Sequence, residues 1–307
     1  MSILEVENLS ISFNQYTGGL KQESVNVISS LNVTLEEGEI LAVVGASGSG
    51  KSLLAHAILG ILPNNSTVSG TITYDREVLT AARQASLRGK DIALIPQSVN
   101  YLDPLMRVGN QVRTSVKDRD AIAAQRAVFE RLHLQSNVES MYPFQLSGGM
   151  ARRTLLSTAI VSGAKVIIAD EPTPGLDPVV IKEALSNFRE FADNGCAVML
   201  ITHDIESALT IADKIAVFYA GTTVEIASVD DFAGDGEALR HPYSKALWRA
   251  LPQNDFIPIP GSQPHPNALP SGCLFTPRCP MATPECSQAQ PDMRNLRNGM
   301  VRCIHAT

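Results

Sequence analysis

The chain has 307 residues, of which 44% are hydrophobic, and it carries a net charge of −6 with a pI of about 5.5. This length suits one large domain with an appendage, or two domains, and the acidic balance argues against nucleic acid as the main ligand. Acidic residues follow Met1 closely, so no basic-then-apolar leader is present, and no apolar run reaches the roughly 20 residues of a membrane helix. We therefore expect a cytoplasmic chain that does not bind nucleic acid.

The chain begins with alternating apolar and polar residues, a pattern typical of antiparallel strands. Two such regions are expected, at 3–13 and 25–38. A continuous apolar strand follows at Ile40–Val44 and an apolar helix at Leu53–Ile61, with a glycine-rich loop between them. This loop, Gly45–Ser52, fits the phosphate-binding pattern G-x-x-x-x-G-K-[ST] in the strand–loop–helix setting that the pattern requires.

The glycine-rich loop predicts a site for a nucleoside triphosphate. Its glycines let successive backbone N–H groups converge on an anion, and the next helix directs its positive N-terminal end at the phosphates. Lys51 is expected to reach the β- and γ-phosphates and Ser52 to bind Mg²⁺. Phe13, well ahead of the loop, is either an adenine-stacking ring or a plain core side chain. The phosphate-binding residues are predicted to be Gly45, Ser47, Gly48, Ser49, Gly50, Lys51 and Ser52.

The periodicity of the following segments predicts a doubly wound α/β core. Alternation resumes at 70–74, and buried strands are expected at 91–97, 166–169, 197–201 and 214–218. Helical stretches at 179–194 and 205–212 separate the last three strands, which is the order of a parallel sheet. Between 98 and 145, short helical patterns such as 121–134 are broken by polar turns and predict a helical insert.

Polar residues that suit phosphate hydrolysis follow three of these strands. Asp170 is expected to hold the Mg²⁺ hydration shell, and Glu171 to polarise the attacking water; the alternative is a helix-capping acidic pair. His203 is expected to bond the γ-phosphate and the water, and Gln97 to offer its amide to Mg²⁺ and the water. We therefore predict Glu171, His203 and Gln97 as catalytic residues.

A second anion site is predicted where Leu146–Met150 opens a helix. Ser147, Gly148 and Gly149 combine a hydroxyl with a bare backbone at a helix start. Since one nucleotide does not need two phosphate sites in the same chain, we expect this site to serve a nucleotide held by a second subunit.

Together these motifs resemble the nucleotide-binding subunit of an ABC transporter. The resemblance implies a P-loop NTPase (RecA-like) parallel-sheet core with an N-terminal antiparallel β subdomain, ATP hydrolysis with Mg²⁺, a nucleotide-binding domain over 1–235 and a helical insert at about 98–160. Phe13 falls where the family has its adenine-stacking aromatic residue, and Met150 replaces the signature glutamine. The matches are Gly45–Ser52 to Walker A, 166–171 to Walker B, Leu146–Met150 to the LSGGQ signature, and Gln97, 175–177 and His203 to the Q-, D- and H-loops.

The proline-rich, cysteine-bearing tail, residues 236–307, narrows the resemblance. Its segments His241–Leu247 and Gly272–Pro280 resemble the C-terminal extension of peptide and nickel importer ATPases. That implies an ATPase that powers import of peptides or of nickel and metal chelates, with nucleotide-driven dimerisation to a second, different ATPase subunit. The complex would hold two membrane permease subunits at the cytoplasmic face of the plasma (inner) membrane, fed by an extracytoplasmic substrate-binding protein. The alternative is a non-transport ABC ATPase acting on nucleic acid or the ribosome, which the single Walker A loop disfavours.

Four of the five cysteines lie in the tail, spaced C-x5-C-x6-C-x16-C. A reducing compartment disfavours disulfides, and the short C-x₂₋₄-C pairs of structural zinc sites are absent. Four thiolates at looser spacing suit an iron–sulfur cluster, and the resembling importer ATPases include members whose tail cysteines hold a [4Fe–4S] cluster. We expect such a cluster, with Zn²⁺ and free thiols as alternatives, on Cys273, Cys279, Cys286 and Cys303.

The segment Tyr101–Met106, just after Gln97, carries apolar side chains that look exposed in the sequence. Two interpretations remain open. The segment either grips a helix of a membrane subunit or packs inside the helical insert. Leu102 and Leu105 are the residues we expect to make either contact.

Overall fold

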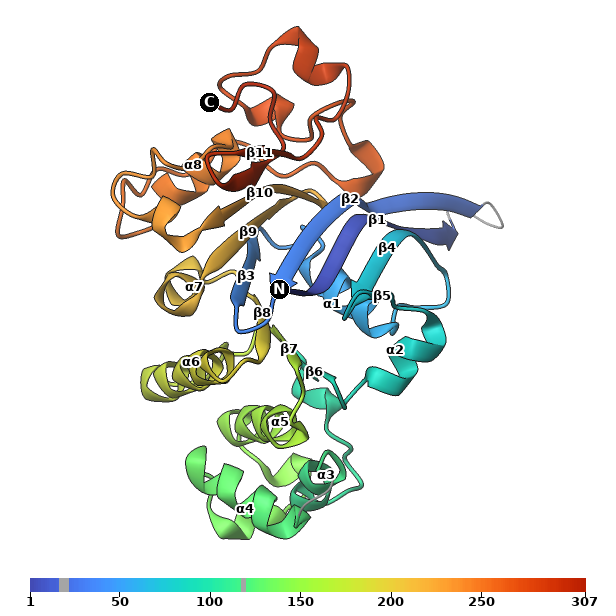
Figure 1. The fold of residues 1–307 in the computed structure, drawn as a ribbon, viewed down its shortest axis with the longest axis vertical. Coiled ribbons are helices and arrows are strands. Elements are labelled where there is room, and N and C mark those ends of the chain that lie inside the picture. Colours follow the sequence, from blue (N-terminus) through green and yellow to red (C-terminus); the bar gives the residue numbers. More distant parts are fainter. Residues whose placement is uncertain (17–21, 117–119) are drawn as a thin grey trace.

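The fold is built on two β-sheets. The computed structural model describes residues 1–16, 22–116 and 120–307 of the chain. The first sheet is antiparallel, with strand order β2-β1-β4-β5 (Figure 1). Its strands are β1 (Ser2–Tyr16), β2 (Gln22–Glu36), β4 (Ser66–Tyr74) and β5 (Glu77–Val78). Leu9 and Ile11 of β1 are buried between exposed or partly exposed neighbours, and Asn8 has a positive φ where the register shifts. The predicted N-terminal antiparallel sheet is confirmed.

The second sheet has eight strands in the order β11-β12-β10-β9-β3-β8-β7-β6. Its parallel part consists of β3 (Ile40–Gly45), β6 (Ile92–Ile95), β7 (Val166–Asp170), β8 (Ala197–Ile201) and β9 (Lys214–Tyr219). All residues of β3, β7 and β8 are buried, as expected of parallel strands covered on both faces. The predicted parallel core is confirmed, and the loops after β3, β7 and β8 leave the same edge of the sheet.

Helices cover both faces of the parallel sheet. Helix α1 (Lys51–Leu59) shares one hydrophobic core with the first sheet and one face of β3. Helix α6 (Pro178–Asp193) and α7 (Ile205–Ile211) pack on the opposite face. The short α2 (Ala81–Leu87) lies beside α1, to which its Gln84 Nε2 donates a hydrogen bond at the Ala57 carbonyl. None of the helices in the described ranges is long and apolar enough to cross a membrane.

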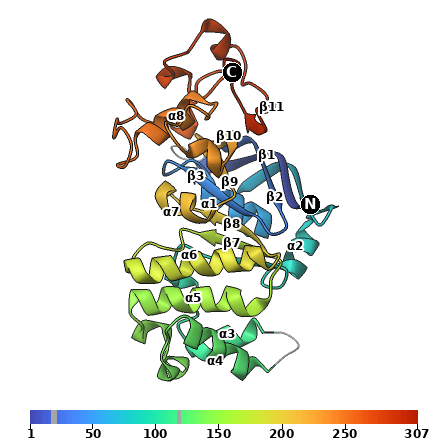
Figure 2. The ribbon, with the colours of Figure 1, turned by 60° about the vertical axis from the view of Figure 1, so that its left-hand side comes forward.

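The predicted helical insert forms one end of the molecule in both views (Figures 1 and 2). It contains α3 (Val108–Thr114), α4 (Ala121–Arg131) and the longer α5 (Gly148–Ser162), and two short 3₁₀ turns lie between α4 and α5. Its apolar side chains, among them Val112 and Phe129, belong to the same core cluster as the sheet face under α6. The insert is therefore packed onto the core rather than held by a linker.

The C-terminal extension lies at the opposite end (Figure 1) and continues the main sheet. Strand β10 (Thr222–Ser228) pairs antiparallel with β9, and β12 (Gly299–Val301) and β11 (Arg294–Leu296) follow it. Helix α8 (Pro242–Arg249) and long loops complete the extension. The sequence predicted the loops but none of these three strands, and β11 and β12 have only three residues each, too few to show strand alternation.

Candidate nucleotide site

The glycine-rich loop runs from the end of β3 to the start of α1. Gly45 touches β9 so closely that a Cβ there would lie 2.3 Å from the Phe218 carbonyl oxygen. Gly50, with φ of 96°, caps α1 in the left-handed region that favours glycine. The loop therefore needs glycine at both ends, and its turn brings backbone N–H groups to the positive end of α1.

Lys51 closes this loop on itself. Its ammonium donates hydrogen bonds to the carbonyl oxygens of Gly45 at 2.8 Å and Ala46 at 3.3 Å. Burial lowers the pKa of Lys51, while the nearby carboxylates of Glu171 and Asp170 oppose that shift. The lysine thus lies at the centre of the loop with acidic groups within electrostatic range.

Ser52 and Asp170 form a second contact at the mouth of the loop. The Ser52 hydroxyl donates to Asp170 Oδ1 at 3.1 Å, although 118 positions separate the two residues. Burial raises the pKa of Asp170, and the hydrogen bond from Ser52 opposes that rise. A hydroxyl and a carboxylate side by side offer the oxygen ligands that Mg²⁺ prefers.

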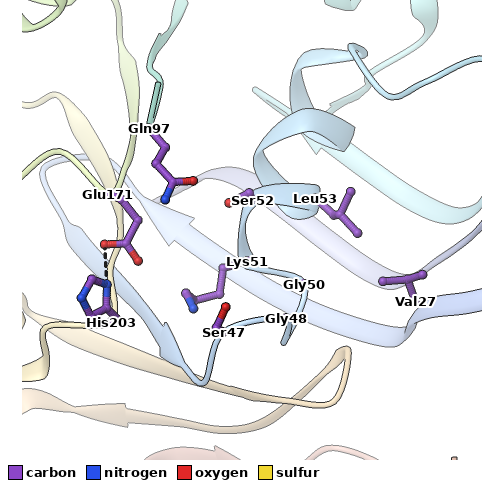
Figure 3. Close-up of a pocket in the computed structure, with 10 residues that line it drawn as sticks. All are labelled: Val27, Ser47, Gly48, Gly50, Lys51, Ser52, Leu53, Gln97, Glu171 and His203. Atoms are coloured by element: carbon purple, nitrogen blue, oxygen red, sulfur yellow. Dashed lines mark hydrogen bonds and ion pairs between the residues drawn. The ribbon is translucent and has the colours of Figure 1, made fainter. Parts of the chain in front are cut away.

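Glu171 and His203 lie opposite the loop and point at each other (Figure 3). The His203 Nδ1 and a Glu171 carboxylate oxygen are 2.9 Å apart, and this carboxylate is buried while the imidazole is largely exposed. Glu171 has φ of 47°, an uncommon conformation for a residue other than glycine, and its N–H donates to Ile201 O at 2.9 Å. The sheet therefore fixes the backbone of Glu171 in a strained turn, as is frequent at functional sites.

These groups surround one cavity of about 500 Å³. That volume is within the usual range for a small-molecule site. Gln97 enters it from the end of β6 and Val27 from β2, so five separate segments meet there (Figure 3). The lining residues are Val27, Ser47, Gly48, Gly50, Lys51, Ser52, Leu53, Gln97, Glu171 and His203.

Seven of the predicted nucleotide contacts lie outside that lining, namely Phe13, Gly45, Ser49, Asp170, Ser147, Gly148 and Gly149. Phe13 is partly buried on β1 and packs against the core under the first sheet. Ser147 caps α5 by accepting a hydrogen bond from Met150 N–H at 3.3 Å. A Cβ at Gly148 or Gly149 would find no described atom within 4 Å. This helix start therefore faces open space, away from the chain's own loop.

We did not predict that Val27 and Leu53 line the cavity, or that Arg152 contributes to the site. The Arg152 guanidinium donates to the carbonyl oxygens of Gln97 at 2.6 Å and Pro96 at 3.2 Å, and burial lowers its pKa. It thereby ties α5 to the segment that presents Gln97. A basic residue one turn into a helix that starts with Ser-Gly-Gly carries no signal for such a backbone contact.

In the segment after Gln97, the structure differs from the expectation that Leu102 and Leu105 make the same kind of contact. Leu102 is buried, with 4% exposure, against Ala151 and Leu155, whereas Leu105 is 87% exposed. Only the second leucine is available to another protein. Beside it lies a cavity of about 350 Å³ lined by Tyr101, Leu102, Met106 and other residues of the insert and β6.

The four tail cysteines converge on one small cavity, of about 10 Å³, with His241 and His305 also in its wall. Cys273 N–H donates to Cys286 O at 2.8 Å, which brings two of the segments together. Burial raises the pKa of Cys279 and Cys303, and neighbouring cysteines add to the rise. Within the described ranges no three His, Cys, Asp or Glu side chains are arranged to hold a single metal ion.

A phosphate loop after a buried parallel strand, facing acids from another parallel strand of the same sheet, defines a P-loop NTPase. The ABC transporter family model matches residues 28–174, and that of the oligopeptide/dipeptide transporter C-terminal region matches residues 224–286. The chain is 35% identical to the oligopeptide transport ATP-binding protein OppD of Salmonella typhimurium, over 94% of this chain and 89% of that protein. It is 32% identical to the dipeptide transport ATP-binding protein DppD of Haemophilus influenzae, over 99% and 95%.

Solved structures show the same fold. A dimeric ATP-binding cassette in a post-hydrolysis state, bound to ADP and Pi, superposes with a TM-score of 0.65 at 22% identity, covering 74% of this chain and 98% of that one. The chain therefore belongs to the ABC transporter family of ATP-binding subunits, in its oligopeptide and dipeptide branch. It is an ATPase subunit, and its nucleotide is ATP with Mg²⁺.

Proposed function

We propose that this chain hydrolyses ATP to power the import of short peptides through a membrane transporter. The main observation in support of ATP hydrolysis is the cavity in which Lys51, Ser52, Glu171 and His203 face one another. Support for peptides as cargo comes from the relatives, whose names assign them to oligopeptide and dipeptide transport. In this proposal residues 1–235 form the nucleotide-binding domain and 236–307 the extension.

In the proposed reaction each side chain has a separate task. The loop N–H groups and Lys51 would bind the β- and γ-phosphates. Ser52 and Gln97 would hold Mg²⁺ and Asp170 its hydration shell, and the ion would neutralise the phosphate charge. Glu171 accepts a proton from the attacking water, and His203 orients that water and the γ-phosphate. Phe13 is our candidate for stacking on the adenine.

The proposed assembly contains a second, different ATPase subunit, two permeases and an extracytoplasmic binding protein, with this chain at the cytoplasmic membrane face. Reconstitution into vesicles tests the cargo. Uptake of labelled di- and tripeptides that requires ATP on this chain's side supports the proposal. Uptake of nickel or a metal chelate, with peptides ignored, would assign the chain to the other branch of importers that share this C-terminal extension.

A charge at Leu105 should uncouple transport from hydrolysis. Leu105 is exposed beside an insert cavity next to Gln97, a suitable place for a permease helix to bind. In reconstituted transporter we expect Leu105→Asp to lower peptide uptake per ATP at least about tenfold, since a carboxylate must then be desolvated against an apolar partner. ATP affinity of the isolated chain should not change.

Ile122→Asp is the matched control, because Ile122 is also exposed on the insert but lies on α4. It should transport normally. Leu102→Asp should instead lower the melting temperature, since Leu102 is buried. Normal coupling in Leu105→Asp would assign the permease contact to another surface.

We further propose that the tail cysteines hold a [4Fe–4S] cluster. Four thiols line one cavity, and the short C-x₂₋₄-C pairs typical of structural zinc sites do not occur among them. In a cluster each thiolate binds a different iron, so wider spacing is acceptable. The cavity is small, so binding requires the loops to separate, and the buried thiols must lose their protons. The cluster's role would be structural.

Anaerobically purified chain should therefore be brown, with about four irons and four sulfides per molecule. Cys279→Ser should bleach it and lower the melting temperature while leaving ATP binding intact. Cys196→Ser is the matched control, because its thiol donates to the Ala164 carbonyl far from the tail cavity's lining. Colourless chain with one zinc per molecule would decide for the alternative metal.

A further inference from the structure

Arg152 of α5 is a buried cation that forms no ion pair with a carboxylate in the part of the chain that the structure describes. The residue is 8% exposed. Its Nη1 donates instead to two main-chain oxygens, those of Gln97 at 2.6 Å and of Pro96 at 3.2 Å. Burying a cation is costly, and here the bonds to these oxygens offset that cost. The charge is thus directed at the backbone that carries Gln97.

Those two oxygens lie directly after β6, at the point where the chain enters the nucleotide cavity. The Gln97 side chain points into that cavity and is part of its lining (Figure 3). Arg152 does not belong to the lining. It therefore contacts the main chain of a site residue without forming part of the site wall.

The segment after Gln97 is attached to α5 a second time. Leu102 is buried in one apolar cluster with Ala151 and Leu155, which lie on either side of Arg152 in the helix sequence. Residues 97–102 thus have a polar attachment at their start and an apolar attachment at their end. Because both attachments are to the first turns of α5, we expect the segment and the helix start to move as one body.

Helix α5 begins at the second anion site. Ser147 is its N-cap, and Arg152 follows five positions later, about 7.5 Å along the helix axis. In the proposed assembly this helix start binds the nucleotide held by the second ATPase subunit. A displacement of the start of α5 is therefore passed through Arg152 to the Gln97 carbonyl.

We propose that Arg152 is a positioning residue that sets where the Gln97 amide enters the nucleotide cavity and links it to the start of α5. The inference rests on the proposed function, in which Gln97 belongs to the chain's own nucleotide site and Ser147 to the site of the second subunit. When the α5 start meets the nucleotide of the second subunit, Arg152 holds Gln97 in its working position in the first site. Arg152 itself touches neither nucleotide.

Arg152→Met keeps a long side chain and removes both hydrogen bonds. In the folded full-length chain, the amides of residues 98–102 should exchange about tenfold faster or more, the effect of one lost charge-assisted hydrogen bond. The amides of β6 should not change. Adding the second subunit with ATP should slow exchange at 148–153 and 97–102 together in the wild-type chain, and only at 148–153 in the variant. Equal slowing of both segments in the variant would overturn the link.

In the assembled transporter, Arg152→Met should lower kcat about 10- to 100-fold, since a group misplaced by about 1 Å can cost that much. The Kd for ATP of the isolated chain should stay within about twofold of the wild-type value, because Arg152 does not line the cavity. Wild-type kcat in folded Arg152→Met would overturn the proposal.

A double-mutant cycle with Gln97→Ala separates positioning from general damage. Because Arg152 is proposed to act through the Gln97 amide, Arg152→Met should lower kcat less than about twofold in a chain that already carries Gln97→Ala. The proposal is overturned if the two losses multiply, or if Gln97→Ala alone keeps the wild-type kcat. Either result would leave the proposed function intact, because turnover by the wild-type transporter tests that function by itself.

Arg153→Met is the matched control. Arg153 is the next residue of α5, and its guanidinium also donates to main-chain oxygens, but to those of Leu132 at 3.3 Å and His133 at 3.1 Å within the insert. Any loss of kcat in this variant should multiply with the loss in Gln97→Ala.

Arg152→Lys takes the place of Arg152→Met in the cycle if the methionine variant does not fold. Lysine keeps the charge on a shorter side chain and lacks the planar fork of donors. The loss of kcat should therefore be smaller, and it should again disappear in the Gln97→Ala background. A loss that multiplies with that of Gln97→Ala would contradict the positioning role in this variant too.

Discussion

Replacing Glu171 by glutamine should leave ATP bound and lower its hydrolysis about 100- to 10,000-fold, the usual contribution of a general base. The amide has the size of the carboxylate and can still bond His203, whose Nδ1 lies 2.9 Å from the present oxygen. It cannot accept the proton of the attacking water. Turnover in the assembled transporter and ATP affinity of the same preparation measure the two effects separately.

Lys51→Ala is the informative comparison, because this variant should lose ATP binding, the step that precedes hydrolysis. Its ammonium is the buried cation of the loop, and a charge-assisted bond to phosphate is worth about 1.5–3 kcal/mol. We expect weak binding in that variant and tight binding without turnover in Glu171→Gln. Wild-type hydrolysis by Glu171→Gln would remove Glu171 from the role of base.

The sequence indicated that several polar residues meet in one cavity, because the positions of these residues follow from local rules. A parallel strand that is buried on both faces is a continuous apolar run, and such strands end at a shared edge. Glu171, His203 and Gln97 follow strands of this kind, and Lys51 begins the helix after another one. Their meeting in one cavity could therefore be deduced without long-range information. Glycine spacing located the loop in the same way.

Contacts between distant segments were not predictable. Nothing in the spacing of Arg152 indicates that its guanidinium bonds the Gln97 carbonyl 55 positions earlier. Leu102 and Leu105 look alike in the sequence, yet one is buried against α5 and the other is exposed. Tyr243 of α8 lines one cavity with Ala46 of the phosphate loop, although the two residues are far apart in the sequence. Tertiary packing decides such cases, and local patterns do not record it.

A carboxylate at Ser147 should stop hydrolysis in the assembled transporter without weakening ATP binding by the isolated chain. Ser147 and Gly148 are exposed and Gly149 is partly exposed at the start of α5, and all three lie outside the lining of the chain's own cavity. Our interpretation is that they bind the γ-phosphate held by the second ATPase subunit, as the N-terminus of a helix binds anions. Ser147→Glu should lower turnover about 100-fold, since it replaces a donor by a negative charge opposite phosphate.

Ser136→Glu serves as the matched control, because Ser136 is an exposed serine that begins a short 3₁₀ turn in the same insert. It should hydrolyse ATP at the wild-type rate. The same interpretation requires the isolated chain to be a poor ATPase whose rate rises when the partner subunit is added, since each site is completed across the interface. The isolated chain could instead hydrolyse ATP fast, independently of its concentration and of Ser147→Glu. That result would show that the start of α5 does not act on a nucleotide held by the second subunit.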